Sequence, residues 1–327
     1  MKMRAVRITR PGGPEVLQMG DAEIRSPGAG EVLVRVHATA VNRADLMQRR
    51  GNYPAPAGWP ADIPGLEYAG TIERCGEAAH RFRGGERVMG IVGGGSYSEY
   101  AVVHEDEVIP VPDALTFEEA AALPEAFITA FDALRVRLAL PIPASGTVLI
   151  HAVASGVGTA ALQFAHVMGL RVFGTARSAW KLERVASLAP ATLIDAGTQA
   201  FVEIVSSKGG ADYIVDLVGG DYLEKNVRAA NKLARIVVVG LVAGAKAELD
   251  MRMLLNKRLT IVGTVLRART LAEKIEVAQL FEREALPWIA SGEVKPVIDR
   301  VLPIEDVQEA HRLAEENSIV GKIVLKW

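Results

Sequence analysis

The sequence is poor in cysteine, in net charge and in long apolar runs. Cys75 is the only cysteine among 327 residues, which excludes an internal disulfide and is typical of a reducing cytoplasm. The formal net charge of −2 gives no electrostatic reason to expect nucleic acid or an anionic membrane as a partner. No apolar run is long enough to span a bilayer, and the N-terminus carries no apolar signal segment. We therefore expect a soluble, cytoplasmic protein.

Metal-ligating side chains are also scarce. One cysteine makes a four-cysteine zinc site impossible, and the six histidines show no ligand spacing. We expect each histidine to be a surface residue or a satisfied core residue.

What the chain does contain is a phosphate-binding type of turn at residues 151–159, directly after an apolar strand at 147–150. Small residues let a bound group approach the backbone, and the following helix directs unpaired N–H groups and its positive dipole end at an anion. Of the G-x-G-x-x-G spacing only the third glycine, Gly158, is present; Val153 and Ser155 hold the first two places. The loop alone leaves an ordinary strand-to-helix turn open.

The region around this loop alternates between strands and helices. Further short apolar strands are predicted at 171–175, 192–195, 213–216, 236–240 and 259–265, and helices at 178–188, 201–207 and 223–230. Such alternation predicts βαβ units and a parallel sheet covered on both faces. Six strands predict a doubly wound nucleotide-binding sheet, whose ligand lies beyond the carboxyl ends of the strands.

The rest of the chain has the pattern of a small barrel or sandwich. Strands are predicted at 5–8, 31–36, 68–72, 86–90 and 97–103, followed by a helix from about 118 to 134. The last part predicts a helix at 272–289, a strand at 294–298, a helix at 304–316 and a strand at 321–325. Periodicity leaves open whether these last strands return to the first domain. We expect a domain at 1–124, completed by 267–327, and a nucleotide-binding domain at 125–266.

Several stretches, in one order from end to end, resemble a known family. They are Pro11-Gly12-Gly13-Pro14-Glu15, residues 30–34, 42–49 and 65–67, Leu123-Pro124-Glu125-Ala126, residues 155–161 and residues 321–325. The whole chain resembles the medium-chain dehydrogenase/reductase superfamily, in its zinc-free NADPH:quinone oxidoreductase branch. The resemblance implies an α/β fold with a GroES-like β-barrel catalytic domain and a Rossmann domain, and an active site in the cleft between them. It also implies NADPH-dependent reduction of quinones or similar conjugated carbonyls.

The resemblance assigns site residues. Asn42, Tyr53 and Thr129 are expected to line the quinone and nicotinamide pocket. The expected cofactor-binding residues are Ser155, Gly156, Val157 and Gly158; Thr175, Arg177, Ser178 and Lys181; Gly240, Leu241 and Val242; Thr264, Val265 and Leu266; and Asn317 and Lys322. Tyr53 can stack on a flat ring, with packing of its proline-rich loop as the alternative. Glu67 is expected to pair with Arg43 or another cation.

The resemblance also bears on zinc. In the alcohol dehydrogenase branch a cysteine precedes the position of Asp45 and a histidine precedes that of Glu67. Here those places hold Asn42-Arg43-Ala44 and Leu66, which cannot ligate zinc. We expect no metal.

The end of the second nucleotide-binding strand predicts NADPH as the cofactor. An enzyme that uses NAD places an Asp or Glu there for the ribose 2′-OH, whereas a 2′-phosphate requires cations. Residues 174–181 contain no carboxylate. Arg177 and Lys181 can neutralise the phosphate, and Ser178 is expected to cap the next helix.

Two rival functions and an assembly remain open at this point. An NADPH-dependent enone or alkenal reductase would use the same cofactor site, and such a fold also occurs in non-enzymatic cofactor-binding proteins. For a quinone, water can protonate the phenolate, so no strong general acid is required.

The strand at 259–265, rich in β-branched residues, is expected to pair across a two-fold axis in a homodimer.

Overall fold

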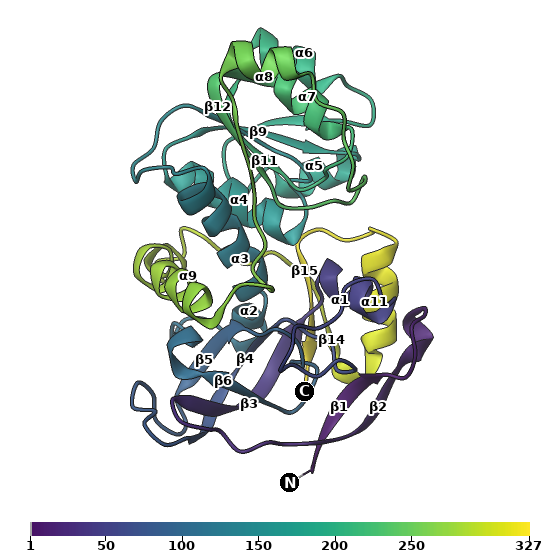
Figure 1. The fold of residues 1–327 in the computed structure, drawn as a ribbon, viewed down its shortest axis with the longest axis vertical. Coiled ribbons are helices and arrows are strands. Elements are labelled where there is room, and N and C mark those ends of the chain that lie inside the picture. The colour runs from purple at the N-terminus through teal and green to yellow at the C-terminus, as the bar shows by residue number, and fades with distance from the viewer. Residues whose placement is uncertain (1) are drawn as a thin grey trace. The chain divides into compact units, whose positions relative to one another are not determined.

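Both ends of the chain build one of its two compact units (Figure 1). The computed structural model describes residues Lys2–Trp327. The first unit comprises the chain up to Ile128 together with Leu266–Gly292 and Pro296–Trp327, and the second comprises Thr129–Val265 and Glu293–Lys295.

The first unit is mainly β structure. An antiparallel pair is formed by β1 (Lys2–Ile8) and β2 (Leu17–Glu23). A larger sheet has the order β14-β15-β3-β4-β5-β7, with β6 also on β3. Its strands are β3 (Glu31–Ala40), β4 (Glu67–Cys75), β5 (Arg87–Ile91), β6 (Tyr100–His104), β7 (Ile109–Pro110), β14 (Ile298–Pro303) and β15 (Lys322–Lys326). Val32, Val34 and Val36 of β3, two apart, enter one apolar core because strand side chains alternate.

The C-terminal strand β15 joins the sheet that the N-terminal part of the chain begins. β15 lies antiparallel to β3, with Val324 opposite Ala40. The helices of this unit are α1 (Arg43–Arg49), α2 (Phe117–Ala121), the start of α3 (Pro124–Phe131), α9 (Leu271–Glu284), α10 (Leu286–Ala290) and α11 (Val307–Glu315). Single 3₁₀ turns are η1 (Pro14–Val16), η2 (Glu105–Glu107) and η4 (Ile304–Asp306). Helix α11 lies beside α1 (Figure 1).

The second unit holds a six-stranded sheet with the order β10-β9-β8-β11-β12-β13, all parallel. The strands are β8 (Thr147–Ile150), β9 (Arg171–Ala176), β10 (Thr192–Asp195), β11 (Ala211–Asp216), β12 (Ala230–Val238) and β13 (Thr260–Gly263). The helices are α4 (Gly156–Val167), α5 (Ala179–Val185), α6 (Phe201–Ser207), α7 (Tyr222–Ala229), α8 (Met251–Lys257) and the π-helical η3 (Asp132–Arg137). Strand order reverses at β8, where doubly wound sheets bind their ligands. The predicted α/β fold class is confirmed.

Some predicted elements are wrong in detail. The helix predicted from 118 to 134 is three segments, and Pro124 opens the second of them. The helix predicted at 272–289 breaks at Ala285, because Pro287 has no N–H to continue it. The strand predicted at 294–298 begins only at Ile298; before it, Lys295 exchanges hydrogen bonds with the side chain of Gln163. The elements β2 and α8 were not predicted.

Candidate functional site

The turn between β8 and α4 has the geometry of a backbone anion site. Ser155 is the N-cap of α4, and its Oγ accepts the N–H of Gly158 at 3.1 Å. Gly156 and Val157 form the first turn, whose N–H groups have no acceptor within the helix. A Cβ on Gly158 would lie 2.2 Å from the carbonyl oxygen of Ala152, so only glycine fits there. This is the glycine that the sequence pattern retained.

A buried polar network supports this turn from below. His151 Nε2 lies 2.6 Å from Asn226 Oδ1, and Asn226 donates through Nδ2 to Asp216 at 2.9 Å. Nε2 of His151 therefore carries the proton, and Nδ1 accepts from the hydroxyl of Thr175 at 2.8 Å. Burial lowers the pKa of His151, which keeps the ring neutral. Thr175, expected to bind the cofactor, directs its hydroxyl to this histidine.

The residues after β9 differ in their exposure. Arg177 is exposed just after the end of the strand. Lys181 is buried, with Nζ 5.4 Å from the centre of the Trp180 ring. Ser178 holds the N-cap position of α5, but its side chain makes no capping hydrogen bond, so the predicted cap is wrong. Arg177 is thus the accessible cation of the three expected residues.

The loop after β12 presents apolar side chains. A Cβ on Gly240 would lie 2.4 Å from the carbonyl oxygen of Leu217, so the chain passes too close for any other residue. Leu241 and Val242 beyond it are 56% and 61% exposed. These expected cofactor residues offer apolar contact surface and backbone polar groups.

The three expected cofactor residues after β13 differ in their contacts, in their exposure and in the unit to which they belong. The hydroxyl of Thr264 donates to Asp132 at 2.7 Å. Val265 is half exposed, whereas Leu266 is buried and belongs to the first unit. Thr129, expected in the substrate pocket, is nearly buried in α3 and belongs to the second unit.

A buried ion pair lies at the start of β4 in the first unit. Lys322 Nζ donates to Glu67 Oε1 at 2.7 Å, to Asn42 Oδ1 at 2.5 Å and to the carbonyl oxygen of Val41 at 3.1 Å. Asn42 Nδ2 also donates to Glu67 Oε1, at 2.7 Å. The cation expected beside Glu67 is thus Lys322, not Arg43. All three N–H donors of Lys322 serve this cluster, which differs from the cofactor contact expected for it.

Two more carboxyl groups adjoin the ion pair. Glu67 Oε2 accepts the backbone N–H of Glu125 at 2.8 Å. Oε2 of Glu125 itself is buried without a hydrogen-bond partner among the described residues. Burial, reinforced by the Glu67 charge, raises the pKa of Glu125 to about 8, and burial raises the pKa of Asp45 to about 6. Glu125 therefore holds its proton at neutral pH.

Arg267 fixes the loop that carries Tyr53. Its guanidinium carbon lies 4.9 Å from the centre of the Tyr53 ring, and NH1 donates to the Tyr53 carbonyl at 3.2 Å. Nε donates to the carbonyl of Gly93 at 2.8 Å, and NH2 to Gln48 Oε1 at 2.5 Å. Arg267 is 3% exposed and acts as a clamp between two loops. One face of Tyr53 is therefore in contact with protein.

The structure distributes the expected site residues over both units. Asn42, Tyr53, Leu266, Asn317 and Lys322 belong to the first unit, and the other expected residues to the second. Within the first unit, Asn42 and Lys322 are in direct contact, because Lys322 Nζ donates to Asn42 Oδ1. Asn317 is exposed just after α11, with φ of +53°.

Sequence reasoning assigned no role to Glu125, Arg267 or His151. Glu125 stands in a stretch quoted for the family resemblance, and that was its only signal. Arg267 directly follows the last predicted nucleotide-binding strand and looks like any solvated arginine. His151 opens the phosphate-binding turn, but its hydrogen-bond partners Thr175 and Asn226 come from two other segments, β9 and α7.

Residues 2–327 contain no group of three or more His, Cys, Asp or Glu side chains that could hold a metal ion. Over the same residues, none of the helices combines the length and the apolar character needed to cross a membrane.

Two family models match the chain. One is described as the alcohol dehydrogenase GroES-like domain and covers residues 28–113; the other is described as zinc-binding dehydrogenase and covers residues 156–283.

Known proteins also match over almost the full length. Mouse quinone oxidoreductase is 32% identical over 336 residues, which is 99% of this chain and 97% of the mouse protein. The structure of Escherichia coli quinone oxidoreductase complexed with NADPH superposes with a TM-score of 0.86 at 26% identity, covering 100% of both chains. A structure titled NAD-dependent alcohol dehydrogenase gives 0.85 at 32% identity, covering 99% of this chain and 100% of the other.

Proposed function

The chain belongs to the medium-chain dehydrogenase/reductase superfamily, in its quinone oxidoreductase branch, and from this premise we propose that it is an NADPH-dependent quinone reductase that works without a metal ion. An oxidoreductase that uses a nicotinamide cofactor and a small-molecule substrate follows from the family. The choice of NADPH, the quinone and the absence of a metal are the parts we propose.

The residues around α4 and β9 fit a dinucleotide. Gly158 lets α4 begin directly against the backbone of residues 152–153, and the N–H groups of the first turn of such a helix can hold a phosphate group. The exposed Arg177 supports NADPH, because a guanidinium can form a bidentate contact with a 2′-phosphate. When bound, the cofactor supplies the hydride, and the chain binds and orients both reactants.

The Lys322–Glu67–Asn42 cluster is the observation that carries the metal-free part of the proposal. A zinc ion needs three donor atoms with free lone pairs directed at one point. Here Glu67 Oε1 accepts hydrogen bonds from Lys322 and Asn42, and Glu67 Oε2 accepts one from the N–H of Glu125. Asn42 Oδ1 accepts a hydrogen bond from Lys322, so the lone pairs of these oxygens are already engaged. The fixed ammonium group supplies the positive charge that Glu67 requires.

One observation favours a second candidate, an NADPH-dependent reductase of enones or alkenals. Reduction of a conjugated carbon–carbon double bond leaves an enolate that must receive a proton, and water protonates carbon slowly. Glu125 is a buried carboxyl group that stays protonated at neutral pH, as a proton donor must.

Turnover measurements distinguish these candidates. NADPH oxidation is followed with a panel of quinones, enones and aldehydes, with and without a chelator, and zinc is measured by elemental analysis. We expect quinones to react fastest, chelator to change nothing and zinc to be below stoichiometric amounts. Faster turnover of enones supports the second candidate. Chelator inhibition that added zinc reverses contradicts the metal-free mechanism.

A further inference from the structure

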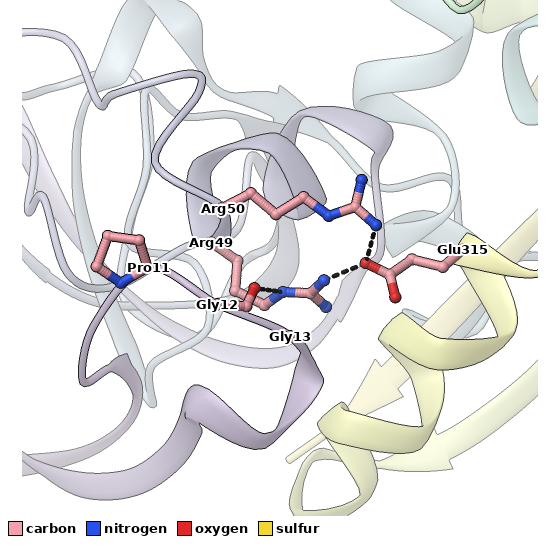
Figure 2. A pocket seen from close by; sticks show the side chains of 6 residues that line it. All are labelled: Pro11, Gly12, Gly13, Arg49, Arg50 and Glu315. Carbon is pink, nitrogen blue, oxygen red and sulfur yellow. Dashed lines mark hydrogen bonds and ion pairs between the residues drawn. The ribbon is translucent and has the colours of Figure 1, made fainter.

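We propose that the first unit carries a second binding site, a pocket for a small phosphate-bearing anion at the end of α1. The pocket has a volume of about 340 Å³, which lies within the range of small-molecule sites. Figure 2 shows its lining: Pro11, Gly12 and Gly13 from the turn after β1, Arg49 and Arg50 from the end of α1, and Glu315 from the end of α11. The Pro-Gly-Gly-Pro turn found in the sequence thus forms one wall.

Arg49 is a preorganised wall of this pocket. Its side chain is fully buried, its Nε donates to the carbonyl of Gly12 at 3.1 Å, and NH1 lies 3.3 Å from His311 Nδ1. His311 is held in turn by the hydroxyl of Tyr97, 3.1 Å from Nε2. Burial lowers the pKa of His311 to about 3, so the ring is neutral and adds no second positive charge beside Arg49. The cation is fixed before any ligand arrives.

The pocket already holds one oxyanion, the carboxylate of Glu315. Arg49 NH2 and Arg50 NH2 both donate to Glu315 Oε1, the latter at 2.6 Å (Figure 2). Two guanidinium groups therefore share a single carboxylate oxygen. Arg50 is half exposed, with Nε and NH1 directed to no acceptor that the structure records. An oxyanion with three acceptor oxygens can engage both arginines more completely than one carboxylate oxygen does.

The charges around the pocket leave an excess of positive charge. A third arginine, Arg43, lies near Arg49 and Arg50. Burial lowers the pKa of Arg43, the charge of Arg50 lowers it further, and the charge of Glu315 raises it. The second nearby carboxylate is Glu15, whose Oε1 accepts the N–H of Gly13 at 3.1 Å. Three guanidinium groups and two carboxylates thus lie in or near the pocket, with Arg49, Arg50 and Glu315 lining it. A simple ion pair that fastens α11 to α1 would not need this third arginine.

Calorimetric titration of the full chain with inorganic phosphate tests the proposal, with ionic strength held constant by chloride. We expect saturable binding by the wild type. Arg50→Gln should weaken it about tenfold, and Glu315→Gln should tighten it, because the internal competitor is removed. The matched control Arg7→Gln, which breaks the exposed pair with Asp62 in the same unit, should leave affinity unchanged.

Further arms of the experiment keep the outcome decisive. Arg50→Lys should retain part of the affinity, and circular dichroism verifies that each variant is folded. Glycerol 3-phosphate separates the two sources of the anion: tighter binding than phosphate identifies an organic phosphate, and equal binding identifies free phosphate. Absence of saturable phosphate binding by the wild type overturns the proposal. Equal loss in Arg7→Gln and Arg50→Gln also overturns it, because the effect is then one of general charge.

Discussion

The ion pair between Lys322 and Glu67 is almost completely shielded from water, with 5% and 0% of the two side chains exposed. Removing one member of such a pair leaves the other buried and uncompensated. We expect Lys322→Met to reduce the free energy of unfolding by about 3–5 kcal/mol, measured by urea denaturation. The exposed Lys232→Met should change it little. The double variant Lys322→Met/Glu67→Gln should recover part of the loss, and no recovery would show that the pair is not the cause.

Glu125 makes stability depend on pH in a defined direction. Its pKa is about 8 in the folded chain against 4.5 for an ordinary glutamate, so between these values the folded chain holds a proton that the unfolded chain has released. The free energy of unfolding therefore falls as pH rises through this window. Glu125→Gln should flatten the dependence in urea titrations between about pH 5 and about pH 8, and the exposed control Glu203→Gln should not. Identical slopes in all three proteins contradict the assignment.

Arg177 should determine the cofactor preference. Losing its contact with the 2′-phosphate is expected to cost about 2–3 kcal/mol in NADPH affinity and little in NADH affinity. Fluorescence quenching with both cofactors measures this in Arg177→Ala. The control is Arg252→Ala, which removes an exposed arginine from α8 of the same unit. Tighter binding of NADH than of NADPH by the wild type would sink the idea.

At the scale of elements, the turn into α4 depends on one missing side chain. A Cβ on Gly158 would meet Ala152 O at 2.2 Å and Val153 Cα at 2.7 Å, both backbone atoms that cannot rotate away. Gly158→Ala should therefore displace the start of α4, weaken cofactor binding at least about tenfold and lower the melting temperature. In Gly84→Ala the new Cβ meets only the carbonyl oxygen of Ile72, at 4.0 Å, which makes it the control. Equal behaviour of the two variants would exclude a steric cause.

The sequence predicted elements well where one periodicity persists and poorly where a single residue interrupts it. The apolar strands of the parallel sheet were found because buried strands are short, apolar and β-branched. Pro287 breaks a helix whose apolar pattern continues across it. The helix α8 was missed because none of its residues is buried, so no apolar stripe marks it. The strand β2, LQMGDAE, has a glycine and two acids and resembles a loop.

The site was harder to predict than the fold. Lys322 and Glu67 are 255 residues apart, and their contact exists only because β15 returns to β3. No local sequence pattern predicts that β15 pairs with β3. Gly158 could be found because its function is local, a close approach of backbone within one turn. Arg267 could not, because its three acceptors come from two distant loops and from helix α1.

At the scale of the whole molecule, the outer edge of β13 is a candidate site for pairing with another chain. β13 ends the six-stranded sheet and pairs with β12 on one side. Apolar side chains near it in sequence are exposed: Leu255 by 70%, Met251 by 57% and Val265 by 50%. An open edge of this kind beside exposed apolar side chains promotes aggregation unless another chain covers it. We therefore propose a homodimer in which β13 pairs with the same strand of a second copy across a two-fold axis.

Proline substitutions in β13 test this assembly. Successive N–H groups of a strand point to opposite sides, so one of Ile261→Pro and Val262→Pro removes a donor on the open side, and the other removes a donor facing β12. The variant that loses the open-side donor should be a folded monomer, and the variant that loses the donor to β12 should be less stable. Ile261→Ala and Val262→Ala keep both donors and should remain dimeric. Light scattering at micromolar concentration measures the mass; a wild-type mass near one chain of 35.0 kDa would mean that something other than a second copy covers this edge.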